Sequence, residues 1–201
     1  GPLHGGGLSE NGTSYMTNTR VFNWTTQNNL EYDLTLGDNE QFISVLLSQR
    51  FQKNKTLSNY SYGENVAAMG LIYPSSFPTN EASAGSFSDW KTLSYLALVN
   101  YSFKDKYIVD LSYRNDGSSR FAADYRFGNF YSAGLAWNLS NENFLADSEI
   151  IDNFKIRASY GESGNNAVGL NTYQALFSYS GSYDDNGTIV PSGFSNPVIS
   201  W

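Results

Sequence analysis

Apolar and polar residues alternate along much of the chain, most regularly in the stretch after residue 106. There the odd-numbered positions from Tyr107 to Tyr113 are apolar or aromatic, whereas Asp110, Ser112 and Arg114 keep the other side polar. Successive side chains of a β-strand point to opposite faces. The pattern therefore predicts a strand with one apolar face and one wet face.

The same period-two pattern recurs and predicts an all-β fold, an antiparallel β-meander. The expected strands are 20–36, 41–52, 92–102, 106–115, 129–139 and 154–161. Gly37–Glu40 and Phe103–Lys106 read as tight turns, and they alternate with long polar connections. Short turns at one end and long loops at the other are typical of the walls of bacterial outer-membrane barrels.

Three long polar segments are expected to be the loops. Residues 53–89 form one excursion, within which 66–72 could be a short helical turn or a buried strand. Residues 115–129 form the second. The third spans 161–201, with a hairpin of its own at 173–182 and 188–190.

Composition narrows the function classes. The 201 residues carry a net charge of −7, with a pI of about 4.6 and no basic patch, which argues against nucleic-acid binding. The absence of cysteine excludes disulfides and thiolate metal sites. No stretch approaches the ~20 apolar residues of a membrane-spanning helix. The 16% aromatic content fits a barrel wall or a Tyr-rich soluble sandwich equally well.

Candidate chemistry is sparse. No P-loop, nucleophile elbow, zinc-protease or dinucleotide motif is present, so we expect no enzyme activity, cofactor or metal site. The sole histidine, His4, lies in a glycine-rich stretch, and residues 1–12 are expected to be a tag scar and flexible linker. Residues 13–201 are then the folded β-barrel fragment. An enzyme domain is disfavoured and stays open as a third reading.

Four blocks of sequence resemble the SusC/RagA family of TonB-dependent outer-membrane transporters. Arg114–Phe121 (RNDGSSRF) resembles the family's R-x-D-G-S-S-R-F signature, and Arg126–Ser132 its R-x-G-x-F-x-S segment. Gly134–Trp137 and Phe154–Asn166 resemble its G-x-x-W and L-R-x-S-Y-G-x-x-G-N-N blocks. The order and spacing of the blocks also match, which no single motif could establish.

This resemblance implies a piece of a large barrel, with partial wall and long extracellular loops, from a protein of the bacterial outer membrane. The parent would import an oligosaccharide or peptide with energy from TonB, beneath a SusD-like lipoprotein lid. The alternative is a soluble carbohydrate-binding β-sandwich, which would bury its apolar faces internally. In an isolated piece of barrel wall we also expect the apolar face to be covered by something rather than exposed.

Two sets of residues are candidates for function. The first surrounds the signature loop, where a network could hold the loop or contact ligand, and comprises Arg114, Asp116, Gly117, Arg120 and Arg126. The second is a set of loop aromatics that could stack on sugar or peptide, pack the loops, or form an interfacial girdle. These are Tyr60, Tyr62, Tyr73, Tyr125, Tyr173, Tyr179 and Tyr183.

Overall fold

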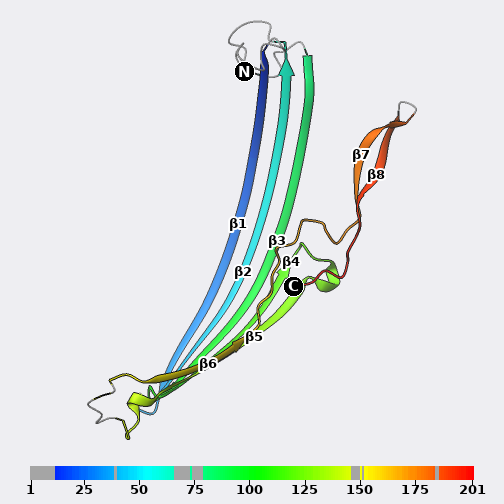
Figure 1. The fold of residues 1–201 in the computed structure, drawn as a ribbon. Helices are drawn as coiled ribbons and strands as arrows, with labels where there is room; N and C mark the ends of the chain where they lie inside the picture. Colours follow the sequence, from blue (N-terminus) through cyan, green and yellow to red (C-terminus); the bar gives the residue numbers. More distant parts are fainter. Residues whose placement is uncertain are drawn as a thin grey trace. The chain divides into compact units, whose positions relative to one another are not determined.

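The structure is a computed structural model that describes residues 12–38, 40–65, 73, 79–145, 150, 152–183 and 186–201, the side chains of 79–82 and 179–187 excepted. Its main element is a six-stranded sheet whose strands follow one another in sequence order (Figure 1). These strands are β1 (Thr13–Leu36), β2 (Gln41–Glu64), β3 (Thr79–Phe103), β4 (Tyr107–Ser118), β5 (Phe127–Asn138) and β6 (Lys155–Gly161). The register is antiparallel from β3 to β6, which confirms the predicted meander.

A second sheet lies in the last segment of the chain. It is a hairpin of β7 (Leu176–Tyr183) and β8 (Asn186–Gly193), close to where a hairpin is expected. The register shifts twice, once beside Pro191, which pairs with Phe177. Proline has no N–H to donate to the ladder, so its place at an irregular point of a two-stranded edge is the tolerated one.

The first three strands are longer than the sequence pattern predicts. β2 continues to Glu64 and β3 begins at Thr79, so the expectation of an irregular excursion over residues 53–89 is wrong for most of that segment. These extensions belong to one compact unit, Gly1–Trp24 with Lys53–Asp89. The other unit comprises Thr25–Gln52 and Trp90–Trp201. The expected turn or strand at 66–72 lies outside the described residues, as do residues 1–11 of the proposed linker.

Cross-strand pairs in the first unit explain why its strands persist without an apolar face. The rings of Tyr15 and Tyr60 lie 4.6 Å apart, and the hydroxyls of Thr19 and Ser58 are 3.0 Å apart. Aromatic pairs and hydroxyl pairs across strands stabilise a sheet without requiring burial. Such pairs leave no one-sided hydrophobic pattern for a sequence reading to detect.

The turn after β3 adopts a demanding backbone. Lys104 and Asp105 both have φ of +54°, in the left-handed region that non-glycine residues seldom adopt. Neighbouring groups hold the turn, because the side-chain amides of Asn138 and Asn141 donate to the Asp105 carbonyl at 2.6 and 3.0 Å. The backbone N–H of Lys104 also donates to the Glu40 carbonyl at 2.6 Å. Adjacent turns of the meander therefore brace one another at this end of the sheet, which we call the turn end.

The register separates two faces from β3 to β6. One face, the apolar face, carries Val109, Leu111, Leu135, Trp137 and Ile156, since Val109 pairs with Leu135 and Trp137 with Ile156. The opposite polar face carries Ser112 against Ser132 and Asp110 against Gly134. This division confirms the assignment of one shared apolar face.

The apolar face is exposed, contrary to the expectation that it would be covered. Leu111 is 49% exposed and Leu135 60%. Among the described residues, Phe121 is the one large apolar side chain that is fully buried. Within the part of the chain that the structure describes, no second layer covers this face of the six-stranded sheet, since its apolar side chains stay exposed. For the same reason the sandwich alternative is wrong, because a sandwich buries apolar side chains between two sheets.

Candidate functional site

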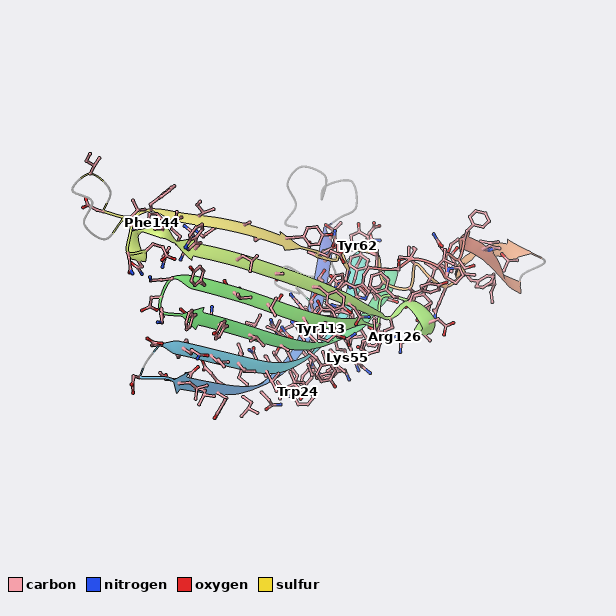
Figure 2. All side chains as sticks on the ribbon, turned by 90° about the horizontal axis from the view of Figure 1, so that it is seen from below. Trp24, Lys55, Tyr62, Tyr113, Arg126 and Phe144 are labelled. Carbon is pink, nitrogen blue, oxygen red and sulfur yellow. The ribbon has the colours of Figure 1, made fainter. Side chains whose placement is uncertain are left out.

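The candidate site lies where β4 and β5 end, on the side away from the turn end, and are joined by the signature loop. Figure 2 shows Arg126 of this loop far along the sheet from Phe144, which lies beyond the turn end of β5. The loop is tied to the sheet by backbone bonds from Ser118 N–H to the Arg126 carbonyl (3.0 Å) and from Ser119 N–H to the Lys91 carbonyl (2.9 Å). The N–H of Lys91 donates in turn to the Ser119 hydroxyl at 2.9 Å. We call this end of the sheet the loop end.

Arg114 and Asp116 form an ion pair on the polar face. They are two positions apart in β4 and so point to the same face. The Arg114 Nε lies 2.7 Å from one carboxylate oxygen of Asp116 and 2.9 Å from the other. The Asp116 side chain is 8% exposed, whereas that of Arg114 is 56% exposed. The pair therefore joins a buried acid to a solvent-facing cation.

Gly117, between these two and the loop, is required by packing. A Cβ at this position would clash with the Phe127 ring, whose Cδ1 would lie 2.8 Å away, closer than real Cβ contacts come. The two residues are directly opposite in the register, and the Phe127 ring covers the glycine. Glycine covered by a cross-strand aromatic ring is a recognised way to stabilise a sheet at such a position.

Arg120 and Arg126 do not bond to Asp116 but to other parts of the loop end. The Arg120 guanidinium donates to the Val168 carbonyl at 2.7 Å and lies 5.5 Å from the ring centre of Trp90, within cation–π range. Arg126 contributes its backbone carbonyl, while its side-chain Nε is buried without a hydrogen-bond partner. The predicted residues thus share one region, but only Arg114 and Asp116 are directly paired among them.

Trp201 packs against the loop end, although it lies 75 residues after Arg126 in the sequence. Its indole N–H donates to the Arg126 carbonyl at 2.9 Å. Its ring lies 5.2 Å from that of the buried Phe121 and 5.9 Å from that of Phe130. A Cβ on Gly128 would be 2.8 Å from this indole, so the backbone of β5 must pass close beneath it. These contacts form a small apolar core inside an otherwise polar loop.

A groove of about 770 Å³ runs along the polar face beside this core. Residues of β1 to β5 and of the last segment line it, and the charged ones are Arg50, Arg114, Asp116, Arg120 and Glu162. Three aromatic residues besides Tyr131, namely Trp90, Phe130 and Trp201, also line it. Hydroxyls of Ser112 and Ser132, which hydrogen-bond to each other, form part of its floor. This combination of donors and aromatic rings suits a polar organic ligand.

The aromatic residues singled out from sequence lie elsewhere. Tyr60 and Tyr62 are in the first unit, where Tyr60 packs on Tyr15 and Tyr62 donates to Glu64 at 2.6 Å. Tyr73 and Tyr125 are exposed, and the Tyr173 hydroxyl accepts from Gln174 at 3.0 Å. The side chains of Tyr179 and Tyr183 lie outside the described residues. Of the five that are described, none lines the groove.

Sequence reasoning found Arg114, Asp116 and Arg120 of the groove lining but missed several other residues that line it. Arg50, Trp90 and Phe130 sit on strands that the pattern predicts or borders, and Trp201 ends the chain. For Arg50, Trp90 and Phe130 the sequence offered one signal, because each falls on the polar side of the period-two pattern of its strand. Which of these positions meet across the sheet depends on register, which the period-two pattern does not determine between strands.

A second cluster of polar contacts lies at the turn end. The carboxylate of Glu142 accepts from the Tyr107 hydroxyl at 2.7 Å, the Trp137 indole at 3.1 Å and the Lys106 ammonium at 3.1 Å. These hydrogen bonds, led by that of Tyr107, hold the pKa of Glu142 below its ordinary value. The Tyr107 ring is stacked between those of Phe103 and Trp137. Aromatic rings with their polar tips turned to one end are the arrangement expected at a membrane–water interface.

Among the described residues, no group of three or more His, Asp or Glu side chains could hold a metal ion. Within the same residues, no helix is long and apolar enough to cross a membrane.

Comparison with known proteins gives a consistent result. The family model described as "TonB dependent receptor-like, beta-barrel" matches residues 3–198. "TonB-dependent receptor P26" of Formosa agariphila is 33% identical over 164 residues, which is 80% of this chain and 16% of the relative. "TonB-dependent receptor SusC" of Bacteroides thetaiotaomicron is 39% identical over 77 residues, covering 38% of this chain and 8% of the relative.

A solved structure shares the fold. The structure described as that of the RagAB peptide transporter superposes with a TM-score of 0.86 at 23% identity. The superposition covers 93% of this chain and 21% of that one. The chain thus spans about a fifth or less of the length of each of these relatives.

Proposed function

Because the chain belongs to the TonB-dependent receptor β-barrel family, in its SusC/RagA branch, we propose that it supplies wall strands and loops to a nutrient importer. Barrels of this family lie in the bacterial outer membrane, and its members are transport receptors rather than enzymes. The observation that carries the proposal is the single-layer sheet, with an exposed apolar face and a grooved polar face. Such a sheet can separate lipid from an aqueous lumen.

The imported nutrient is an oligosaccharide or a peptide. A peptide is supported by the RagAB structure, which is described as that of a peptide transporter, and an oligosaccharide is what the sequence resemblance to the SusC/RagA family implies. The groove offers hydroxyl, amide and guanidinium donors beside aromatic rings, and both ligand classes use such groups. Bulky polar nutrients of this kind fit an open groove better than a closed cavity.

The energy for import and the partner proteins would be supplied from outside this chain. TonB would act through another part of the parent protein, and a SusD-like lipoprotein would cover the loop end. The fixed loop between β4 and β5 supports this second role, because its backbone bonds to β3 and its small core give a partner a preformed surface. Within this arrangement the signature residues Arg114, Asp116 and Gly117 set the shape of the loop end, and they carry no reaction.

Uptake by cells tests the proposal. The gene for the full-length protein would be deleted, and growth measured on defined oligosaccharides and on peptides as sole nutrient. Loss of growth on one class, restored by the full-length gene but not in a strain without TonB, is the expected result. Unchanged growth and uptake on every nutrient tested would refute a role in import.

A further inference from the structure

The groove at the loop end differs in charge from the rest of the molecule. The chain as a whole carries −7, yet the groove is lined by three arginines and two carboxylates. A second cavity of about 660 Å³, nearer the turn end of the same face, is lined by Glu31 and Asp110 and by no basic residue. Positive charge is therefore concentrated at the loop end of the polar face.

The carboxylates in the groove do not neutralise all of its arginines. Asp116 is engaged by Arg114 through contacts of 2.7 and 2.9 Å. Glu162 accepts a hydrogen bond from the Tyr160 hydroxyl at 3.1 Å, and it forms no ion pair with a described residue. Arg50 and Arg120 are thus without a carboxylate partner in the described part of the chain.

The two arginines differ in whether neighbouring residues hold the guanidinium group in place. Arg120 is fixed, since its guanidinium donates to the Val168 carbonyl and lies over the Trp90 ring. Arg50 is exposed on β2 and forms no hydrogen bond or ion pair with the described residues. A guanidinium presents a planar fork of N–H donors that matches the oxygens of a carboxylate or sulfate. A fixed cation beside an aromatic ring and a second cation without a partner among the described residues therefore line the same groove, and both can donate to such a group.

We propose that this groove binds an anionic group of the imported ligand, a carboxylate or a sulfate, through Arg50 and Arg120. The inference rests on the proposed import function and adds the ligand's charge to it. Trp90 supplies the adjacent ring face, on which a sugar ring or a peptide side chain stacks. Acidic oligosaccharides and acidic peptides are then the preferred nutrients.

The test measures binding to the full-length receptor in detergent by isothermal titration calorimetry. Three matched pairs of probes separate charge from shape. They are oligogalacturonate and its methyl ester, a sulfated galactan oligosaccharide and its desulfated form, and a glutamate-containing peptide and its glutamine counterpart. At least one acidic member should bind about tenfold more tightly than its neutral partner, as expected for a charge-assisted hydrogen bond, and added salt should weaken that binding.

Substitutions of Arg50 and Arg120 test whether these two side chains cause the preference for the acidic probe. Arg50→Gln and Arg120→Gln should each remove most of the preference for the acidic member, and Arg50→Lys should restore part of it. Arg20→Gln is the matched control, because Arg20 is exposed in the first unit and lies outside the groove. Since Arg50 is exposed and unpaired, its replacement should leave the melting temperature of the ligand-free receptor unchanged.

Three results would overturn the inference. They are equal affinity for both members of every pair, an unchanged preference in Arg50→Gln at an unchanged melting temperature, and an unchanged preference in Arg50→Gln at a lower melting temperature. The last would indicate that another segment of the parent protein fills the groove. Binding and uptake of neutral probes alone would leave the import function standing, whereas absence of binding and of uptake for all probes would refute both.

Discussion

A charge placed at Leu111 tests the membrane-facing assignment most directly. The neighbouring strand β5 sets the scale, because the aromatic residues Trp137 and Phe127 lie on the apolar face ten positions apart. At about 3.4 Å per residue this is about 34 Å of strand, or about 26 Å along the membrane normal for a tilt of about 40°. This matches the ~25 Å height of the apolar band of such barrels. Trp137 and Phe127 therefore mark the two borders of the apolar band.

Leu111 lies near the middle of this band. It pairs with Ala133, four positions from Trp137, which places it about 10 Å inside the nearer border. Leu111→Arg should therefore destabilise the barrel by about 2–4 kcal/mol, the cost of an arginine near the bilayer midplane. Ser112→Arg is the matched control on the polar face. It should cost about 1 kcal/mol, the hydrogen bond between the Ser112 and Ser132 hydroxyls.

The assay is reversible urea unfolding of the full-length barrel in lipid vesicles, followed by tryptophan fluorescence. The free energies of unfolding of the wild type and the two variants are compared at constant lipid composition. An equal cost for the two substitutions, or a larger cost for Ser112→Arg, would refute the assignment of the apolar face to lipid.

Three further changes test the ends of the sheet. Asp116→Ala should lower the free energy of unfolding by about 1.5–3 kcal/mol by removing the buried partner of Arg114, and a variant that folds normally but loses ligand would show that the loop binds nutrient instead. Gly117→Ala should cost about 1–3 kcal/mol through its clash with Phe127, and the loss should largely disappear in a Phe127→Ala background, whereas additive costs would exclude the clash. Because the pKa of Glu142 is lowered, its stabilisation is complete above the ordinary glutamate value of about 4.3 and is lost as pH falls through the folded-state pKa. Unfolding midpoints from pH 7 to 3 should fall less steeply in Glu142→Gln, and identical slopes would contradict this.

The strands of the wall between β3 and β6 could be predicted because one face is mostly apolar. Tyr107, Val109, Leu111 and Tyr113 and their partners on β5 recur at every second position, so strand and face follow together. The extensions of β2 and β3 could not be predicted in this way. There, Lys55 lies over the Phe87 ring, a cross-strand contact between a charged and an aromatic residue that produces no one-sided apolar pattern.

The contacts of the candidate site were likewise predictable from the sequence only in part. The pairing of Arg114 with Asp116 follows from two positions on one strand, which alternation places on one face. The contact of Trp201 with Arg126 joins positions 75 residues apart, and the groove shared by Arg50 and Arg120 is lined by residues of β1 to β5 and of the last segment. No local sequence pattern predicts contacts between residues so far apart in the chain. They come from strand register and from the course of the last segment.

The location of the buried Phe121 has a consequence for how this sequence can change over time. Lipid is a fluid neighbour that tolerates one aliphatic shape as well as another, so Leu111 could be exchanged for Ile, Val or Phe at little cost. Phe121, packed against Trp201 within a loop, has neighbours of fixed shape and little such freedom. In soluble proteins the framework is constrained and the loops drift. Here the constraint falls on the loop around Phe121 and Trp201 rather than on the exposed apolar face of the sheet.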